Sequence, residues 1–174
     1  MMNRKILAVC LDCGDTLVDE ATEVKTPEGV SLRAELIPGA ADLVKALKAR
    51  GYPLALVADG PCDTFTNNLG PYDLYNLFDA YAISETVGVS KPDARMFRCA
   101  LEQLGIEEGD YGRVVMVGNV LERDVKGANE LGLISVWLNW SPRRNKIPVD
   151  ANEVPQYTLH NPLELLDLLD ELEK

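Results

Sequence analysis

The stretch Ile6-Leu7-Ala8-Val9-Cys10-Leu11-Asp12 decides the fold, because it is an apolar run that ends on an acid. A second run of this kind, Val114-Val115-Met116-Val117-Gly118, is followed by Asn119 and Asp124. Short apolar runs followed by helical patterns are typical of buried strands in a parallel sheet. Ligands of such sheets bind outside the carboxyl ends of the strands, so the polar residues after these runs are candidates for one site.

A lysine extends this set of candidates. Lys91 lies in a loop that opens with Gly88 and is closed by Pro92. One ammonium group and three acid or amide groups at one edge of a sheet indicate a site for a divalent cation and a phosphate.

Length and charge limit the classes of function. The chain has 174 residues, which predicts a single domain over 1–174 with a full core. The formal net charge of −11 argues against binding to nucleic acid or to an anionic membrane, because both need a basic face. A phosphorylated partner would therefore have to be held by a local cation, either a metal ion or a lysine.

Targeting signals and cysteine usage favour the cytoplasm. The first apolar run is too short for a signal peptide, and no segment approaches the length of a membrane span. Cys10 and Cys13 have the spacing of a redox pair, but Cys10 falls inside a predicted strand. A buried, unreactive Cys10 is therefore the preferred interpretation, with a redox role as the alternative.

Strand and helix signals alternate along the chain and predict an α/β fold built on a parallel sheet. Further strands are expected over 53–58, 81–84 and 133–138, and helices over 39–50, 93–104 and 122–131. A last helix is predicted from Asn161 as its N-cap with Pro162 and Glu164 following. Residues 18–36 are expected to form a loop or a small hairpin, 63–79 a weak helix, and 141–156 a long surface loop.

Three motifs together resemble the haloacid dehalogenase-like hydrolase superfamily. Leu11-Asp12-Cys13-Gly14-Asp15-Thr16-Leu17 looks like its first motif, Gly88-Val89-Ser90-Lys91-Pro92-Asp93 like its lysine motif, and the segment from Val117 to Ala128 like its acidic metal motif. The resemblance spans Lys5 to about Asn139 and implies a three-layer, Rossmann-like, doubly wound parallel sheet.

The resemblance also implies a mechanism, that of a Mg²⁺-dependent phosphatase. Asp12 would be the nucleophile that forms an aspartyl-phosphate, and Lys91 would bridge Asp12 and the phosphoryl oxygens. Mg²⁺ would be held by Asp12, the carbonyl of Gly14 and Asn119, with Asp124 as a further ligand or as a neighbour of the ligands.

Three positions depart from the phosphatase pattern of the family, and they predict a slow or specialised catalyst. Gly14 stands where the family has a second aspartate, which acts as general acid. Asp15, one place later, is a candidate for that role, and a turn residue bonded to its own backbone is the equal alternative. Asn119 replaces a metal-ligating aspartate, so the site loses one negative charge and should bind the ion more weakly.

The third departure is Ala58, which lacks the hydroxyl that would hold a phosphate oxygen. Its loss leaves the backbone amides of Asp59 and Gly60 as candidate substrate-binding donors. Arg143 and Arg144 follow a predicted strand and could reach a substrate anion, although a solvated pair of loop residues is the preferred interpretation.

The spacing of the motifs leaves no room for the cap domain of many relatives. An open site suits a large phosphorylated substrate, or one that another subunit closes, and the oligomeric state stays open. Two alternatives to the phosphatase remain: a catalytically impaired protein of this fold with a binding or regulatory role, and a metal-free dehalogenase, to which the resemblance is weaker because those relatives carry a cap.

Overall fold

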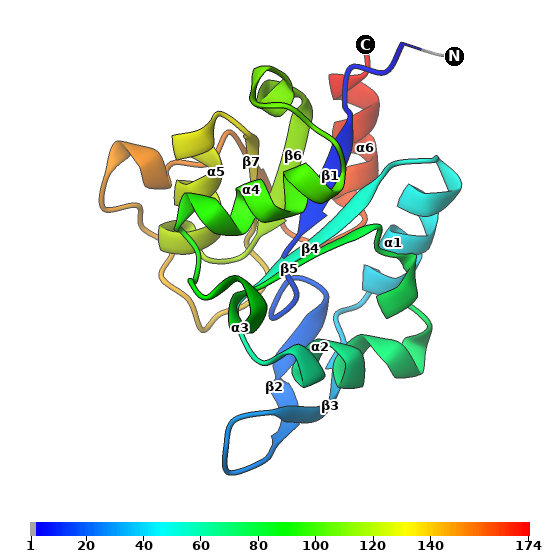
Figure 1. Cartoon of the computed structure of the whole chain (residues 1–174), viewed down its shortest axis with the longest axis vertical. Coiled ribbons are helices and arrows are strands. Elements are labelled where there is room, and N and C mark those ends of the chain that lie inside the picture. Colours follow the sequence, from blue (N-terminus) through cyan, green and yellow to red (C-terminus); the bar gives the residue numbers. More distant parts are fainter. Residues whose placement is uncertain (1–2) are drawn as a thin grey trace.

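Six segments of the chain pair as parallel strands, in a computed structural model that describes residues 3–174 (Figure 1). The strands are β1 (Ala8–Leu11), β4 (Leu54–Ala58), β5 (Ala80–Ile83), β6 (Val114–Gly118), β7 (Ile134–Leu138) and β8 (Tyr157–Leu159). Their order in the sheet is β5-β4-β1-β6-β7-β8, and every neighbouring pair is parallel. The chain therefore starts in the middle, builds outward to β5, and returns to the other side of β1, which is doubly wound topology.

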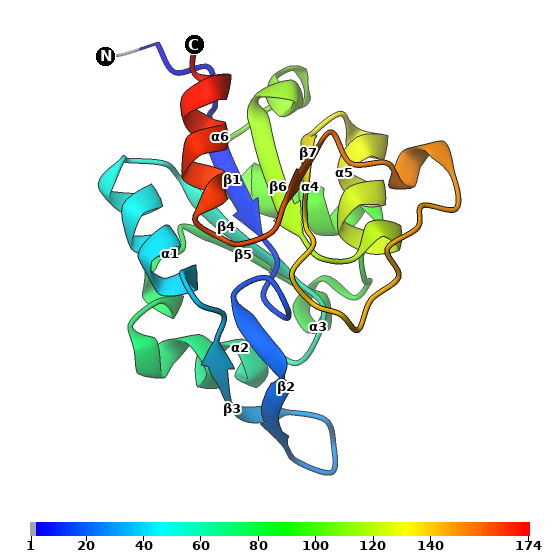
Figure 2. The same ribbon diagram turned by 180° about the vertical axis from the view of Figure 1, so that it is seen from behind.

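Helices cover both faces of this sheet. The helices of the described residues are α1 (Ala40–Ala49), α2 (Cys62–Leu69), α3 (Ser84–Val87), α4 (Ala94–Gln103), α5 (Lys126–Leu131) and α6 (Glu164–Leu172), of which α2 packs against the segment Ser31–Leu36. Short helical turns are η1 (Gly70–Tyr72), η2 (Tyr75–Leu77), η3 (Glu108–Arg113), the π-helical turn η4 (Leu121–Val125) and η5 (Ala151–Glu153). Figures 1 and 2 show α4 and α5 on one face and α1 and α6 on the other. The predicted three-layer α/β fold is confirmed.

Successive side chains of each strand point to opposite faces of the sheet and pack into two separate cores. In β1, Val9 and Leu11 join the core under α1 and α6, whereas Ala8 and Cys10 join the core under α4 and α5. Parallel strands buried on both faces become continuous apolar runs, which explains the run that opens the chain. Burial of Cys10 raises the pKa of its thiol to about 12, as its preferred interpretation expects.

A two-stranded hairpin follows β1 and projects beyond the sheet (Figure 1). Its strands β2 (Val18–Lys25) and β3 (Ser31–Leu36) are antiparallel, so the hairpin alternative for 18–36 is the one that the chain adopts. Ser31 fastens it to α2, because its amide donates to Thr64 Oγ1 at 2.9 Å and its hydroxyl donates to Asn68 Oδ1 at 2.8 Å. Within the described residues no larger domain is inserted before or after β4, in agreement with a core that lacks a cap.

Local details differ from the sequence-based expectations. The helix predicted over 122–131 begins with the π-helical turn η4, and β8 was not predicted. The last helix begins at Glu164, three residues beyond Asn161, yet the capping bonds form: the Glu164 amide donates to Asn161 Oδ1 at 3.3 Å, and Glu164 Oε2 accepts from the His160 amide at 3.0 Å. In the part of the chain that is described, no helix is long and apolar enough to cross a membrane.

Candidate active site

The central strands β1 and β6 bring two of the motifs together. They are hydrogen-bonded neighbours, with Leu11 paired to Val117, so Asp12 and Asn119 leave the sheet at the same edge. The chain departs from β1 towards β4 and from β6 towards β7, and this divergence opens a crevice at the carboxyl ends of the strands.

Lys91 joins the carboxylates of Asp12 and Asp124. Its Nζ donates to Asp12 Oδ1 at 2.8 Å, to Asp124 Oδ1 at 2.6 Å and to the Val57 carbonyl at 2.8 Å. The residue is only 4% exposed, and an ammonium group has three protons, so every donor has a buried acceptor. The predicted residues 12, 91, 119 and 124 thus lie together.

The position of Asp124 depends on the π-helical turn and on a glycine. Its Oδ2 accepts from the Val120 amide at 2.9 Å, which leaves Oδ1 directed at Lys91. A Cβ atom at Gly118 would lie 2.2 Å from Asp124 Cγ, so the carboxylate can pack at the end of β6 only over a glycine.

The site carries more buried negative charge than Lys91 can compensate. Burial and the neighbouring Asp124 raise the pKa of Asp12 to about 7, and Lys91 offsets this rise only in part. Burial alone would lower the pKa of Lys91, but the carboxylates of Asp12 and Asp124 outweigh burial and raise it above its ordinary value. Two carboxylates around one ammonium leave one negative charge uncompensated, which a further cation could neutralise.

The oxygens around Asn119 fit such a cation. A terminal atom of its side-chain amide lies 3.0 Å from Asp12 Oδ2 and 3.1 Å from the Gly14 carbonyl oxygen. With the nitrogen there, Asn119 donates two hydrogen bonds; with the oxygen there, three oxygens face one another without a proton between them. Oxygen ligands at 2.0–2.1 Å in an octahedron lie about 3 Å apart, so the second orientation matches a Mg²⁺ ligand set.

This ligand set is poor in charged groups. Among the residues described, no group of three or more His, Cys, Asp or Glu side chains could hold a metal ion. The candidate set instead combines an acid with an amide and a backbone carbonyl, which are oxygen ligands that suit Mg²⁺ but attract it less strongly than carboxylates.

A small cavity of about 50 Å³ lies over these groups. Its lining residues come from the sheet edge, the hairpin and the loops around them: Asp12, Gly14, Glu20, Asp59, Phe65, Lys91, Asn119, Val120, Arg123, Asp124 and Arg144. A second cavity of about 230 Å³ shares Gly14, Glu20, Asp59 and Phe65 with it and extends between the hairpin and α2. The first has the size of a small anion, and the second offers space for the group attached to it.

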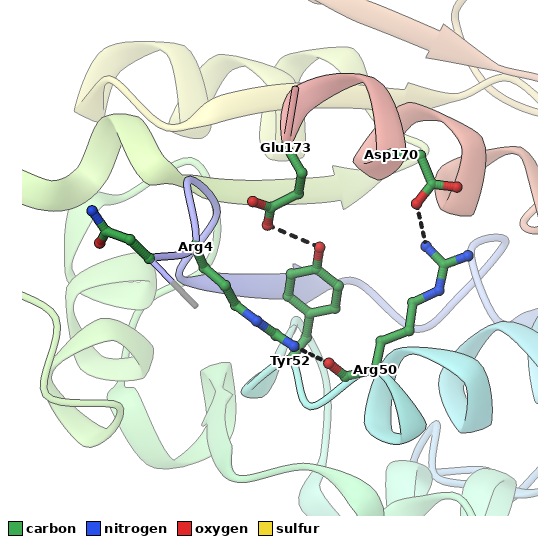
Figure 3. Close-up of a pocket in the computed structure, with 6 residues that line it drawn as sticks. Arg4, Arg50, Tyr52, Asp170 and Glu173 are labelled. Carbon is green, nitrogen blue, oxygen red and sulfur yellow. Dashed lines mark hydrogen bonds and ion pairs between the residues drawn. The ribbon is translucent and has the colours of Figure 1, made fainter. Parts of the chain in front are cut away.

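A larger cavity, of about 450 Å³, lies at the opposite edge of the sheet (Figure 3). Figure 3 shows Arg50 paired with Asp170 and the Tyr52 hydroxyl bonded to Glu173, at 2.9 and 3.0 Å. These groups fasten α6 to the segments before β1 and β4. We place the reactive site at the smaller cavity, because its polar groups converge at the carboxyl ends of the strands.

The predicted substrate-binding residues are only partly at the small cavity. Asp59 and Lys91 line it, but Ala58 and Gly60 do not. The Gly60 amide donates to Ser84 Oγ at 2.8 Å and is already used. The Asp59 carboxylate accepts from the Lys91 amide at 2.9 Å and lies 3.7 Å from Arg123 Nη1, so it holds the lysine loop in place.

Asp15 and Glu20 occupy unexpected places. Asp15 is fully buried, with φ of 51°, and its Oδ1 accepts from the Glu20 amide and from Arg143. It does not line the cavity. Glu20 does, and its carboxylate lies over Gly14, so that Glu20 Oε1 is 2.0 Å from the position of a Cβ on that glycine. A carboxyl group from β2 therefore fills the space that the missing aspartate side chain would enter.

Arg143 and Arg144 lie in a loop with side chains 37% exposed, and both also form ion pairs that the sequence did not indicate. They lie on residues 141–150, which we call the strap, and each guanidinium bonds an acid near the hairpin. Arg143 Nη2 donates to Asp15 and to Asp19, the latter at 3.0 Å, and Arg144 Nη2 donates to Glu20 Oε2 at 2.5 Å. The sequence could not reveal these ion pairs, because pairing with a segment more than 120 residues away leaves no local signal.

Comparison with known proteins agrees with the motifs. A family model described as haloacid dehalogenase-like hydrolase matches residues 10–132. Glyceraldehyde 3-phosphate phosphatase of Methanopyrus kandleri is 30% identical over 128 residues, which are 74% of this chain and 54% of that protein. Pyrimidine 5'-nucleotidase YjjG of Escherichia coli is 31% identical over 155 residues, covering 89% of this chain and 62% of that one. The chain thus spans little more than half the length of these relatives.

A solved structure shows the same architecture. The crystal structure of a HAD phosphatase from Thermococcus onnurineus superposes with a TM-score of 0.67 at 29% identity, over 78% of this chain and 59% of that one.

Proposed function

Because the chain belongs to the haloacid dehalogenase-like hydrolase family, we propose that it is a Mg²⁺-dependent phosphatase that acts through an aspartyl-phosphate on Asp12. The observation that carries the proposal is the contact of Lys91 Nζ with both Asp12 and Asp124, next to the side-chain amide of Asn119 and the carbonyl oxygen of Gly14. The named phosphatase and nucleotidase among the relatives support phosphate monoesters as the substrate class.

The residues divide the reaction between them. An Asp12 oxygen attacks phosphorus, the bond from phosphorus to the leaving oxygen breaks, and the leaving alkoxide takes a proton. Water then hydrolyses the acyl phosphate, which releases phosphate and restores Asp12. Lys91 fixes the orientation of Asp12 and neutralises part of the charge that gathers on the phosphoryl oxygens.

Asp12, the Gly14 carbonyl and Asn119 would hold Mg²⁺, with Asp124 beside them. When bound, the ion would offset the charge of the two approaching anions and polarise the phosphoryl oxygens. Asn119 in this set predicts weaker binding of the ion than an aspartate would give.

The leaving group would enter the 230 Å³ cavity beside Gly14. A small phosphate monoester suits that space, and a large phosphorylated substrate at the open site stays the alternative. The placement of Glu20 over Gly14 supports Glu20, rather than Asp15, as the carboxyl group that faces the leaving oxygen. The cytoplasmic location expected from the sequence stays a prediction that cell fractionation can test.

Acyl phosphate labelling tests the proposal directly. Acetyl phosphate needs no general acid, so with Mg²⁺ it should label the wild-type chain on Asp12 even if the activity toward alkyl esters is slow. Intact-mass spectrometry after rapid quenching should show the added phosphoryl group, and Asp12→Asn or removal of Mg²⁺ with EDTA should abolish it. A folded wild-type chain that is never labelled at high Mg²⁺ would instead support a binding or regulatory protein of this fold.

A further inference from the structure

We infer that Arg144, on the strap, holds a phosphoryl oxygen of the substrate and takes the place of the hydroxyl that Ala58 lacks. This inference rests on the proposed function, because it assigns a ligand within the same site. It gives the strap a role in binding as well as in covering the hairpin.

The first support is the place of the guanidinium. Arg144 lines the same small cavity as Asp12 and Lys91, although it lies more than 50 residues beyond Lys91 in the chain. Its side chain is 37% exposed, so it borders the cavity rather than being enclosed in the core. Its Nη2 donates to Glu20 Oε2 at 2.5 Å.

The second support is a donor without an acceptor. Nε of Arg144 is buried and has no hydrogen-bond partner among the described residues. A buried N–H without a partner is unfavourable, and such groups in native proteins call for an explanation. An anion in the cavity that Arg144 lines would supply the missing acceptor.

The third support is that two of the donors expected to bind the phosphoryl group, the Lys91 ammonium and the Gly60 amide, already have acceptors within the protein. Lys91 already spends its three protons on Asp12, Asp124 and the Val57 carbonyl. The Gly60 amide donates to Ser84. A phosphate dianion that entered the cavity would also meet several carboxylates, and a guanidinium offers it both charge and two parallel donors.

The competing interpretation is that Arg144 only ties the strap to the hairpin through Glu20. The two interpretations predict different effects on phosphate binding when either Arg144 or Glu20 is substituted. If the pair is purely structural, Arg144→Gln and Glu20→Gln act alike. If Arg144 binds the phosphoryl group, Arg144→Gln weakens phosphate binding, whereas Glu20→Gln strengthens it by removing a competing carboxylate.

The experiment measures binding of inorganic phosphate, with Mg²⁺ at constant ionic strength, by titration calorimetry on the full chain. Arg144→Gln should raise the dissociation constant about 10- to 100-fold, in the range of a charge-assisted hydrogen bond, and Arg144→Lys should recover part of the affinity. Lys146→Gln removes one positive charge from an exposed position of the same strap, where Lys146 pairs with Asn139, and should leave phosphate binding unchanged.

Several outcomes overturn the inference: no binding of phosphate by the wild type, wild-type affinity in Arg144→Gln, equal losses in Arg144→Gln and Glu20→Gln, or an equal loss in Lys146→Gln. Circular dichroism of each variant shows whether it is folded. Labelling of Asp12 by acetyl phosphate separates this result from the proposed function. Labelling that persists while Arg144→Gln keeps full phosphate affinity defeats the inference alone, whereas absent labelling defeats the phosphatase.

Discussion

Lys91 links the chemistry of the site to its stability, because the same ammonium whose charge would offset that of the phosphate also compensates two buried carboxylates. A buried ion pair with an uncompensated third charge is unfavourable to folding. The reactive end of the sheet should therefore cost the fold some stability in the absence of a metal ion.

Asp12→Asn tests this cost. In metal-free solution at pH 8 the substitution should raise the free energy of unfolding by about 1–2 kcal/mol, because it removes one of the two carboxylates that share Lys91. The pKa of Asp12 is raised in the folded state to about 7, so the folded chain binds a proton at Asp12 more tightly than the unfolded chain does. The stabilisation from this proton is complete below the unfolded pKa and is lost as the pH rises towards 7. Chemical denaturation in EDTA at pH 5 and pH 8 measures both effects.

At pH 5 the advantage of the Asp12→Asn variant should shrink, since wild-type Asp12 is then largely protonated. A variant that is less stable than wild type at both pH values would contradict the explanation.

Substitutions at Glu20 and Asp15 should affect turnover of alkyl and aryl phosphates differently. Glu20→Gln should slow hydrolysis of an alkyl phosphate about 10²-fold, the low end of general acid catalysis, and should affect an aryl phosphate much less because its leaving group needs no proton. Asp15→Asn should change the two substrates in parallel, since its carboxylate bonds Arg143 and a backbone amide. Steady-state kcat on both esters decides between them, and a selective loss in Asp15→Asn would restore Asp15 to the catalytic role.

The residues predicted from the sequence are those that follow a strand directly or lie in a short loop beside one. Asp12, Asn119 and Lys91 belong to this class, because the parallel sheet alone brings their backbone positions together. Glu20 and Arg144 could not be predicted in the same way. Their approach depends on the conformation of the hairpin and of the strap. The available signal for Glu20 was its place two residues after the buried Val18, on the same side of β2, and for Arg144 it was its place in the loop after a predicted strand.

At the scale of elements, α6 shows how the amino-terminal segment is held. Glu173 near the end of this helix accepts hydrogen bonds from the Lys5 and Ile6 amides at 2.9 and 3.3 Å. It also accepts one from the Tyr52 hydroxyl at 3.0 Å, which Figure 3 shows. Burial opposes ionisation of Glu173, but these hydrogen bonds prevail and lower its pKa.

Glu173→Gln should therefore lower the free energy of unfolding by about 1 kcal/mol at pH 7, a modest value because solvent reaches the group. Since the folded-state pKa is lowered, the stabilisation is present above the ordinary glutamate pKa and is lost as the pH falls through the folded value. Urea titrations at pH 7 and pH 3.5 should show a difference between variant and wild type that shrinks in acid. Glu171→Gln, which removes an exposed charge from the same helix, is the control.

Element boundaries were predicted less well than element types. The π-helical turn η4 stands where a regular helix was expected, and its extra residue sets Asp124 over Gly118. The hydrophobic periodicity of the sequence does not distinguish such a turn from a regular helix. The missed strand β8 has only three residues, and two of them are exposed, so no apolar run marks it.

At the scale of the molecule, the order of the strands places the site at the centre of the sheet. A metal ion that binds this site should stabilise the whole fold. Mg²⁺ that binds only the folded chain should raise the stability by about 1.4 kcal/mol at ten times its dissociation constant. For a domain of this length that corresponds to a rise of roughly 3–6 °C in the unfolding midpoint. Calorimetry should show a larger rise in Asn119→Asp, whose added carboxylate attracts the ion, and none in Asn119→Ala.

If residues 1–174 form one domain, as we propose, the same scans should show one cooperative transition. Two transitions, with only one of them responding to Mg²⁺, would contradict a single domain.

The walls of the small cavity have two origins. Asp12, Lys91 and Asp124 stand on the sheet and its adjoining turns, whereas Glu20 and Arg144 reach in from the hairpin and the strap. A mutant library that randomises positions 18–36 and 141–150 but keeps Glu20 and Arg144 should consequently shift preference among phosphate esters while sparing the ability to accept a phosphoryl group, so that new selectivities could be evolved without rebuilding the reactive end of the molecule.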